Sequence, residues 1–218
     1  MISTMNLSSI PPIEELRRLT KSLATLDAII ERDWNRRYFS FNSKWDTTEQ
    51  MASMRNGEGD SWFLVFGPQG AFLKGFDHES KMSPAANEMG RIWPGVLSEV
   101  PEQFKSFVKE PAFSPQDTTF SIWRGHDDDG WHKGKIVYPE GKDPDGSARL
   151  LSILDGNPKT YRRWAEAYYK RPISLPQVEH VYAHKPLTEG VVQALNPGTH
   201  LAELSDELAE IDYPKANN

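Results

Sequence analysis

The sequence predicts an α+β fold in a single domain, residues 1–218, and three features lead to this prediction. Residues 13–31 have the apolar periodicity of an amphipathic helix. Four short apolar segments between Arg37 and Glu79 are separated by turn-forming residues, which is typical of an antiparallel β-meander. The last third of the chain is again mostly helical in pattern. The expected architecture is an N-terminal helix, a meander extended by a further hairpin, and a helical C-terminal third.

The helix over residues 13–31 is the clearest single element. Its apolar residues recur at steps of three and four on one stripe: Ile13, Leu16, Leu19, Leu23, Leu26 and Ile30. Pro11 and Pro12 stand where a first helical turn tolerates proline. Because the stripe is shorter than three heptads, we expect it to pack on the sheet rather than to form a coiled-coil dimer. The preceding residues 1–11 are expected to be flexible.

The meander is predicted from its strands and its turns together. The four strand segments are residues 37–46, 49–55, 60–66 and 70–79. Asn56-Gly57 marks a hairpin between the second and third segments. Gly67-Pro68-Gln69-Gly70 suits a type I turn after the third. Since the third segment is apolar on both faces, we expect it to be central and covered on both sides.

The elements after the meander are predicted from shorter patterns. Residues 80–100 carry no regular pattern, and residues 101–109 read as a helix that Pro111 ends. Residues 118–124 and 133–139 read as the two strands of the further hairpin. In the last third we expect helices from about residues 147, 158, 189 and 201, and a strand at 178–183, where apolar and polar residues alternate.

Composition narrows the class of function. The chain has 218 residues, no cysteine and a net charge of −6. The lack of cysteine excludes thiol catalysis and thiolate metal sites. The acid excess argues against sequence-independent binding of nucleic acid, because such binding needs clustered lysine and arginine. It suits a basic protein partner. The excess is greatest near the end, where five acids precede Lys215: Glu203, Asp206, Glu207, Glu210 and Asp212.

No segment indicates a membrane or a secretion route. No apolar run approaches the roughly 18 residues of a spanning helix. The first residues lack both the basic start and the apolar core of a signal peptide. We therefore expect a cytoplasmic protein without membrane association. The sequence leaves its oligomeric state open and indicates no cofactor.

Asp77, His78 and Glu79 form the first candidate site, at the end of the fourth strand segment. A histidine between carboxylates could act as a general base whose pKa the acids raise. However, neighbouring residues in an extended segment point to opposite faces, so His78 shares a face with both acids only if a turn intervenes. The alternative interpretation is a polar strand end in which His78 has a structural role.

Residues 125–132 form the second candidate site. His126, Asp127, Asp129 and His132 combine oxygen and imidazole ligands that could hold a divalent cation. The calcium-loop pattern fails here, because aligning its glycine with Gly130 places glycine and isoleucine at the first and last ligand positions. We therefore interpret the segment as a solvated hairpin loop and predict no metal.

The third candidate is a binding surface on the meander. Its aromatic residues are Trp34, Tyr38, Trp45 and Trp62, and Trp45 lies in a polar turn beside Asn42, Lys44 and Asp46. Aromatic rings next to polar groups are typical of ligand pockets and of protein interfaces. The alternative interpretation places most aromatic rings of the meander in the core.

Several blocks of the chain together resemble a family of bacterial proteins with no assigned activity. These blocks are residues 38–46, 51–57, 74–80, 93–96, 100–104 and 118–123. In addition, Val100-Pro-Glu-Gln-Phe-Lys-Ser-Phe107 resembles the Leu-Pro-led helix of SMI1/KNR4-type immunity proteins. That resemblance implies an acidic α+β binding module that neutralises a toxin. The helix precedes the sheet in that family and follows four strands here, so no site residues are carried over.

Three functional hypotheses follow, and the leading one is a non-catalytic bacterial binding protein. It would be an immunity or accessory factor for a basic protein partner, since the acidic balance suits one and no catalytic motif is present. The second hypothesis is a hydrolase or metal-dependent enzyme that uses His78 with Asp77 or Glu79. The third is a small-molecule sensor with an aromatic-lined pocket on the meander.

Overall fold

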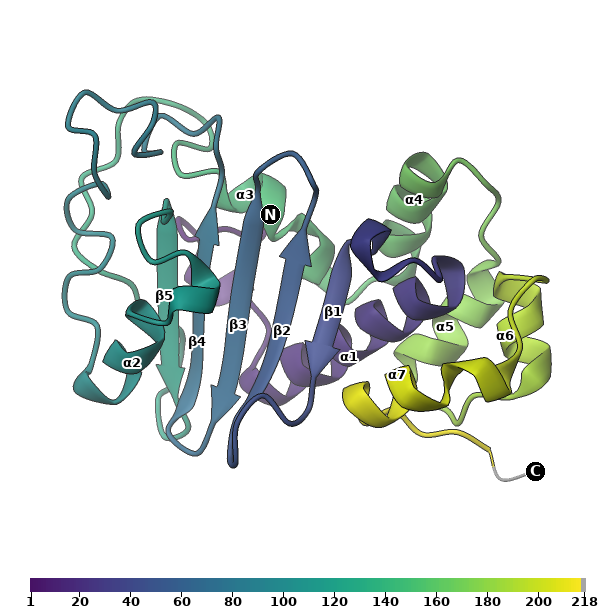
Figure 1. Cartoon of the computed structure of the whole chain (residues 1–218). Coiled ribbons are helices and arrows are strands. Elements are labelled where there is room, and N and C mark those ends of the chain that lie inside the picture. Colours follow the sequence, from purple (N-terminus) through teal and green to yellow (C-terminus); the bar gives the residue numbers. More distant parts are fainter. Residues whose placement is uncertain (217–218) are drawn as a thin grey trace.

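The centre of the molecule is an antiparallel sheet in the order β1-β2-β3-β4-β5 (Figure 1). The computed structural model describes residues 1–216. The strands are β1 Phe39–Asn42, β2 Gln50–Arg55, β3 Ser61–Gly67, β4 Gly70–Phe76 and β5 Phe120–Gly125. The predicted meander is therefore confirmed, with β3 at its centre.

The second strand of the expected further hairpin does not form. Only an isolated bridge joins Trp123 of β5 to His132. The following segment bonds instead to the irregular residues 80–100, because Lys135 N donates to Ser98 Oγ at 3.0 Å and Trp93 Nε1 donates to the carbonyl of Val137 at 2.9 Å. Backbone groups that these partners satisfy do not need a neighbouring strand.

Helices cover one face of the sheet and extend beyond its β1 edge. Helix α1, Ile13–Ile30, lies behind the sheet in Figure 1, and its stripe is buried as predicted. The C-terminal helices gather beyond β1: α4 Pro158–Tyr169, α5 Leu175–Tyr182, α6 Glu189–Leu195 and α7 Ser205–Ile211. The expected strand at 178–183 is wrong, since it lies in α5. Val178 and Val181 are buried three positions apart, a helical spacing that the short alternation concealed.

Two apolar clusters lie on opposite faces of the sheet. The larger joins α1, the sheet and the C-terminal helices. The smaller lies on the other face, under two 3-10 turns, Glu102–Phe104 and Pro111–Phe113, and helix α2, Lys105–Val108. Figure 1 shows α2 and these turns over the β4–β5 side. The outer face of β1 and β2 is left less covered.

Residues 1–11, expected to be flexible, instead pack against the rest of the chain. Ile2 and Ile10 belong to the larger apolar cluster. Thr4 is fully buried, and its backbone N donates to Ser147 Oγ at 3.0 Å. The segment lacks helical or strand periodicity, so its isolated apolar residues gave no signal of this docking. Within residues 1–216, none of the helices combines the length and apolar character needed to cross a bilayer.

Candidate functional site

The first candidate site is an ionic cluster around Arg149. Its Nη2 lies 2.6 Å from Asp60 Oδ2 and 2.7 Å from Asp77 Oδ2. Asp60 directly precedes β3, Asp77 directly follows β4, and Arg149 belongs to the short helix α3, Ser147–Leu150. Both carboxylates are buried, while the Arg149 side chain is 47% exposed. A half-exposed guanidinium thus joins two buried carboxylates on neighbouring strands.

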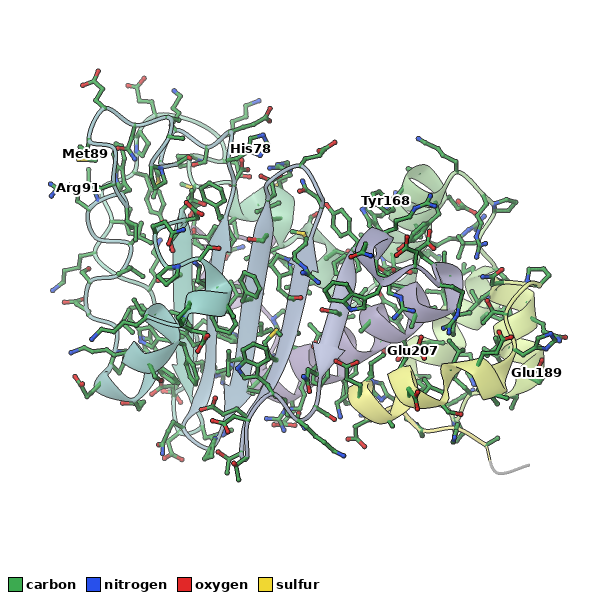
Figure 2. All side chains as sticks on the ribbon, viewed as in Figure 1. His78, Met89, Arg91, Tyr168, Glu189 and Glu207 are labelled. Carbon is green, nitrogen blue, oxygen red and sulfur yellow. The ribbon has the colours of Figure 1, made fainter. Side chains whose placement is uncertain are left out.

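His78 pairs with Asp60, not with Asp77 or Glu79. Its Nδ1 lies 2.7 Å from Asp60 Oδ1, and its backbone N donates to the same oxygen at 2.9 Å. The hydrogen bond to Asp60 raises the pKa of the His78 ring. Burial would raise the pKa of Asp60, but hydrogen bonds from His78 and Arg149 outweigh it and hold that pKa below its usual value. His78 lies at the surface near one end of the sheet (Figure 2).

Asp77 and Glu79 have separate surroundings. Asp77 Oδ1 accepts from the backbone N of Glu79 at 3.0 Å and of Ser80 at 3.1 Å, so this oxygen holds the turn after β4. Glu79 is exposed. Asp77 and His78 therefore belong to one cluster, as expected, but Asp60 is the acid that pairs with His78, and Glu79 lies outside the cluster.

The cluster has the residue types of a metal site, but its carboxylate oxygens are already hydrogen-bonded. Asp60, Asp77 and His78 each offer a ligand atom, and these atoms lie within 4.8 Å of one another. However, all four carboxylate oxygens already accept hydrogen bonds, and the Arg149 guanidinium lies between the two acids. Arg149 therefore supplies the positive charge that a metal ion would bring. A pocket of about 270 Å³ opens beside Asp77, Glu79 and Arg149.

The loop of the second candidate site is held by its own contacts. His126 Nε2 lies 3.1 Å from the carbonyl of Gly67. Asp128 Oδ2 accepts from the backbone N of Gly125 at 2.7 Å and lies 3.4 Å from His132 Nε2. Asp127 and Asp129 are exposed. Among residues 1–216, the atoms of Asp60, Asp77 and His78 have the spacing of a metal site, whereas those of this loop do not.

The third candidate site is a groove of about 240 Å³ on the open face of β1 and β2. At one end the Arg55 guanidinium lies 4.3 Å from the ring centre of Trp34. At the other end Trp45 and Phe63 both stack on Phe113, with ring centres 5.6 and 4.7 Å from it. The groove is therefore lined by aromatic rings contributed by the meander and by the turn before β5.

The four binding residues expected from sequence divide between groove and turn. Trp45 and Asn42 line the groove, whereas Lys44 and Asp46 are exposed outside its lining. Asn42 Oδ1 also accepts from Lys44 N at 2.8 Å, which shapes the turn that carries Trp45. Of the other aromatic rings expected at this surface, Trp34 also lines the groove, whereas Tyr38 and Trp62 are not part of its lining.

Carboxylates gather where the groove ends at Trp45. Burial, and then the charges of Asp46 and Glu110, raise the pKa of Glu49. Like charges raise the pKa of a carboxyl only when they lie near it, so these three acids form a cluster. Glu110 directly precedes the 3-10 turn that carries Phe113. These three acids stand beside the groove, and Glu210 of α7 is a carboxylate of the lining itself.

No protein family, curated protein or solved structure matches the chain.

Proposed function

We propose that this chain is a non-catalytic binding protein that holds a basic segment of a protein partner in the groove on β1 and β2. The observation that carries the proposal is the aromatic groove with carboxylates at one end. A lysine or arginine side chain can lay its apolar stem on the ring of Trp45 and direct its charge to acids such as Glu49. Arg55 makes a contact of this kind within the groove, because its guanidinium lies over the ring of Trp34.

Charge supports a basic partner over other classes. The net charge of −6 favours association with a positively charged surface. Asp46 and Glu110 repel the negative charge of Glu49, and a bound cation would reduce this repulsion. The expected role of immunity or accessory factor is one form of this proposal.

The test measures binding of short oligo-arginine, oligo-lysine and oligo-glutamate peptides by fluorescence anisotropy. We expect the basic peptides to bind, and Trp45→Ala and Glu49→Gln each to weaken binding about tenfold. Asp127→Asn is the matched control, because Asp127 is an exposed acid in the loop after β5. If this control weakens binding as much as Glu49→Gln does, the attraction is only that of net charge and the groove is not the site.

One observation favours a second candidate, the hydrolase that uses His78. The buried Asp60 fixes Nδ1 of His78, while the His78 side chain stays 41% exposed, an orientation that suits a general base. The test compares wild type with His78→Ala on activated ester and phosphate substrates such as p-nitrophenyl acetate and p-nitrophenyl phosphate. Equal rates for both proteins would leave His78 as a structural residue of the Arg149 cluster.

A further inference from the structure

The groove on β1 and β2 has opposite charges at its two ends. Glu49 directly precedes β2 and stands beside the Trp45 end, while Arg55 is the last residue of β2 and lines the other end. Because a strand rises about 3.4 Å per residue, the steps along the chain from Glu49 to Arg55 span about 20 Å. A segment that lies along the groove therefore meets an acid at one end and a base at the other.

The acidic end carries carboxylates from separate segments of the chain. Both charges that act on Glu49, those of Asp46 and Glu110, are negative. Glu210 of α7 lines the groove, and its carbonyl accepts from the backbone N of Ser43, directly after β1, at 2.8 Å. Since β1 and β2 are antiparallel, the end of β1 lies beside the start of β2, and Glu210 belongs to the same end as Glu49.

The basic end consists of Arg55 and the ring of Trp34. The Arg55 side chain is exposed, and its guanidinium lies 4.3 Å from the ring centre. Partial burial lowers the pKa of Arg55, and no neighbouring carboxylate raises it. Within residues 1–216, Arg55 therefore has no acidic partner. The ring holds the guanidinium but supplies no carboxylate, so the donors of Arg55 remain available to one.

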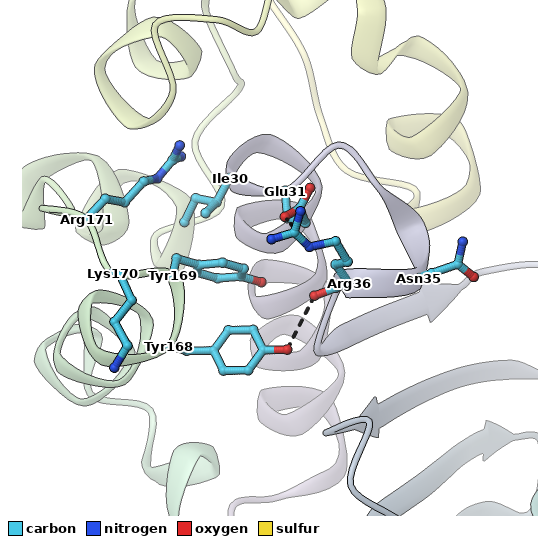
Figure 3. Close-up of a pocket in the computed structure, with 8 residues that line it drawn as sticks. All are labelled: Ile30, Glu31, Asn35, Arg36, Tyr168, Tyr169, Lys170 and Arg171. Atoms are coloured by element: carbon cyan, nitrogen blue, oxygen red, sulfur yellow. Dashed lines mark hydrogen bonds and ion pairs between the residues drawn. The ribbon is translucent and has the colours of Figure 1, made fainter.

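The neighbouring arginines are already paired. Arg36 belongs to the same 3-10 turn as Trp34 and lies 3.5 Å from Glu31, and Figure 3 shows the two side chains together. Arg37 follows this turn and lies 3.1 Å from Glu207. An acid that enters the groove thus finds the charge of Arg55 and not those of its neighbours.

The lining between the two ends carries no charge. Ser40 and Ser53 lie opposite each other, and their hydroxyl oxygens are 2.7 Å apart in a hydrogen bond. Met51 and Phe63 add apolar side chains. An extended peptide rises by about the same distance per residue as β2, so two of its residues about six positions apart reach both ends. An even spacing also places both side chains on one face of the peptide.

We propose that the groove binds an extended peptide segment whose basic residue lies on Trp45 and whose acidic residue, six positions away, pairs with Arg55. This inference rests on the protein-binding function proposed above and specifies the segment that is bound. The two charges fix the register of the segment in the groove, because a shift along β2 separates both of them from their partners.

The test measures the affinity of three peptides of equal length, with both termini blocked, by isothermal titration calorimetry. The first, Arg-Lys-Ser-Leu-Ser-Leu-Ser-Glu, has its glutamate six positions after the lysine. The second ends in glutamine instead, and the third has the glutamate moved next to the lysine. We expect the first peptide to bind about fivefold more tightly than the other two, the effect of one partly exposed ion pair.

Variants of the protein assign this preference to one residue. Arg55→Gln should abolish the preference for the first peptide and leave the affinity for the glutamine peptide unchanged. Arg91→Gln is the matched control, because Arg91 is an exposed arginine outside the groove lining, on the loop of residues 80–100 (Figure 2). This control should keep the full preference.

Three outcomes would overturn the inference. Equal weakening of the first two peptides by Arg55→Gln would show that Arg55 only supports the ring of Trp34. If wild type binds all three peptides equally, no acidic residue pairs with Arg55, while the function of binding a basic segment stands. If neither these peptides nor oligo-arginine binds, the proposed function fails together with this inference.

Discussion

The hydroxyl of Tyr161 donates to Oδ1 of Asp27 at 2.7 Å, inside the core between α4 and α1. The other oxygen of Asp27 accepts from the backbone N of Tyr38 at 3.0 Å and of Phe39 at 2.8 Å. One buried carboxyl therefore ties α1, α4 and the start of β1 together. Burial raises its pKa from 3.8 to about 6, although these hydrogen bonds lower it.

This pKa predicts a stability that falls as the pH rises. Well below pH 3.8 Asp27 is protonated in both the folded and the unfolded chain. As the pH rises through about 6, the folded state must ionise a buried carboxyl that is already ionised in the unfolded state. The contribution lost is about 3 kcal/mol. Asp27→Asn should remove this slope, as measured by urea unfolding of both proteins from pH 4.5 to 7.5; parallel pH profiles would contradict the prediction.

Arg149→Met should destabilise the protein by about 2 kcal/mol. The substitution leaves Asp60 and Asp77 as buried carboxylates without their cation. The loss is smaller than for a fully buried pair, because the half-exposed guanidinium is partly screened by water. Chemical unfolding at pH 7 measures it, with Arg163→Met on the exposed surface of α4 as control. If Arg149→Met loses no more stability than the control, the cluster does not stabilise the fold and the prediction is wrong.

Lys74→Met should destabilise the turn that carries Phe113. Lys74 is buried in β4, and its Nζ donates to the carbonyls of Phe113, Ser114 and Asp117. Without these donors the three carbonyls are left unsatisfied, which we expect to lower stability by about 2 kcal/mol. Amide hydrogen exchange should accelerate over residues 113–117 more than elsewhere. Basic peptides should also bind more weakly, since Phe113 lines the groove; unchanged exchange would contradict the prediction.

Gly75→Ala should destabilise the sheet by about 1–3 kcal/mol through overpacking. A Cβ at Gly75 would lie 2.0 Å from Cζ of the fully buried Phe120 on β5. Gly67→Ala is a control in the same sheet, because its nearest contact, Glu49 Cγ, is 3.5 Å away. Thermal unfolding of the two variants compares them directly, and equal midpoints would show that Phe120 can move.

The sequence by itself determined the elements whose signal is local. The stripe from Ile13 to Ile30 and the turns around Asn56 and Gly67 fix α1 and the meander, because helical period and turn chemistry act within a few residues. The same local patterns gave a wrong prediction for residues 178–183, because a segment of six residues can fit both the helical and the strand period. It also misassigned 133–139, whose backbone groups bond to a loop distant in sequence.

The candidate sites depend on contacts that local patterns do not encode. His78 pairs with Asp60, 18 positions earlier, and Arg149 reaches the same acid across 89 positions, so nothing next to His78 in the sequence indicates this cluster. The same holds for the groove, where Phe113 stacks on Trp45 and the buried Lys74 bonds the turn of residues 113–117 to β4. Only the tertiary structure decided these neighbours, since charges and rings distant in the chain meet through the packing of whole elements and not through the periodicity of any one.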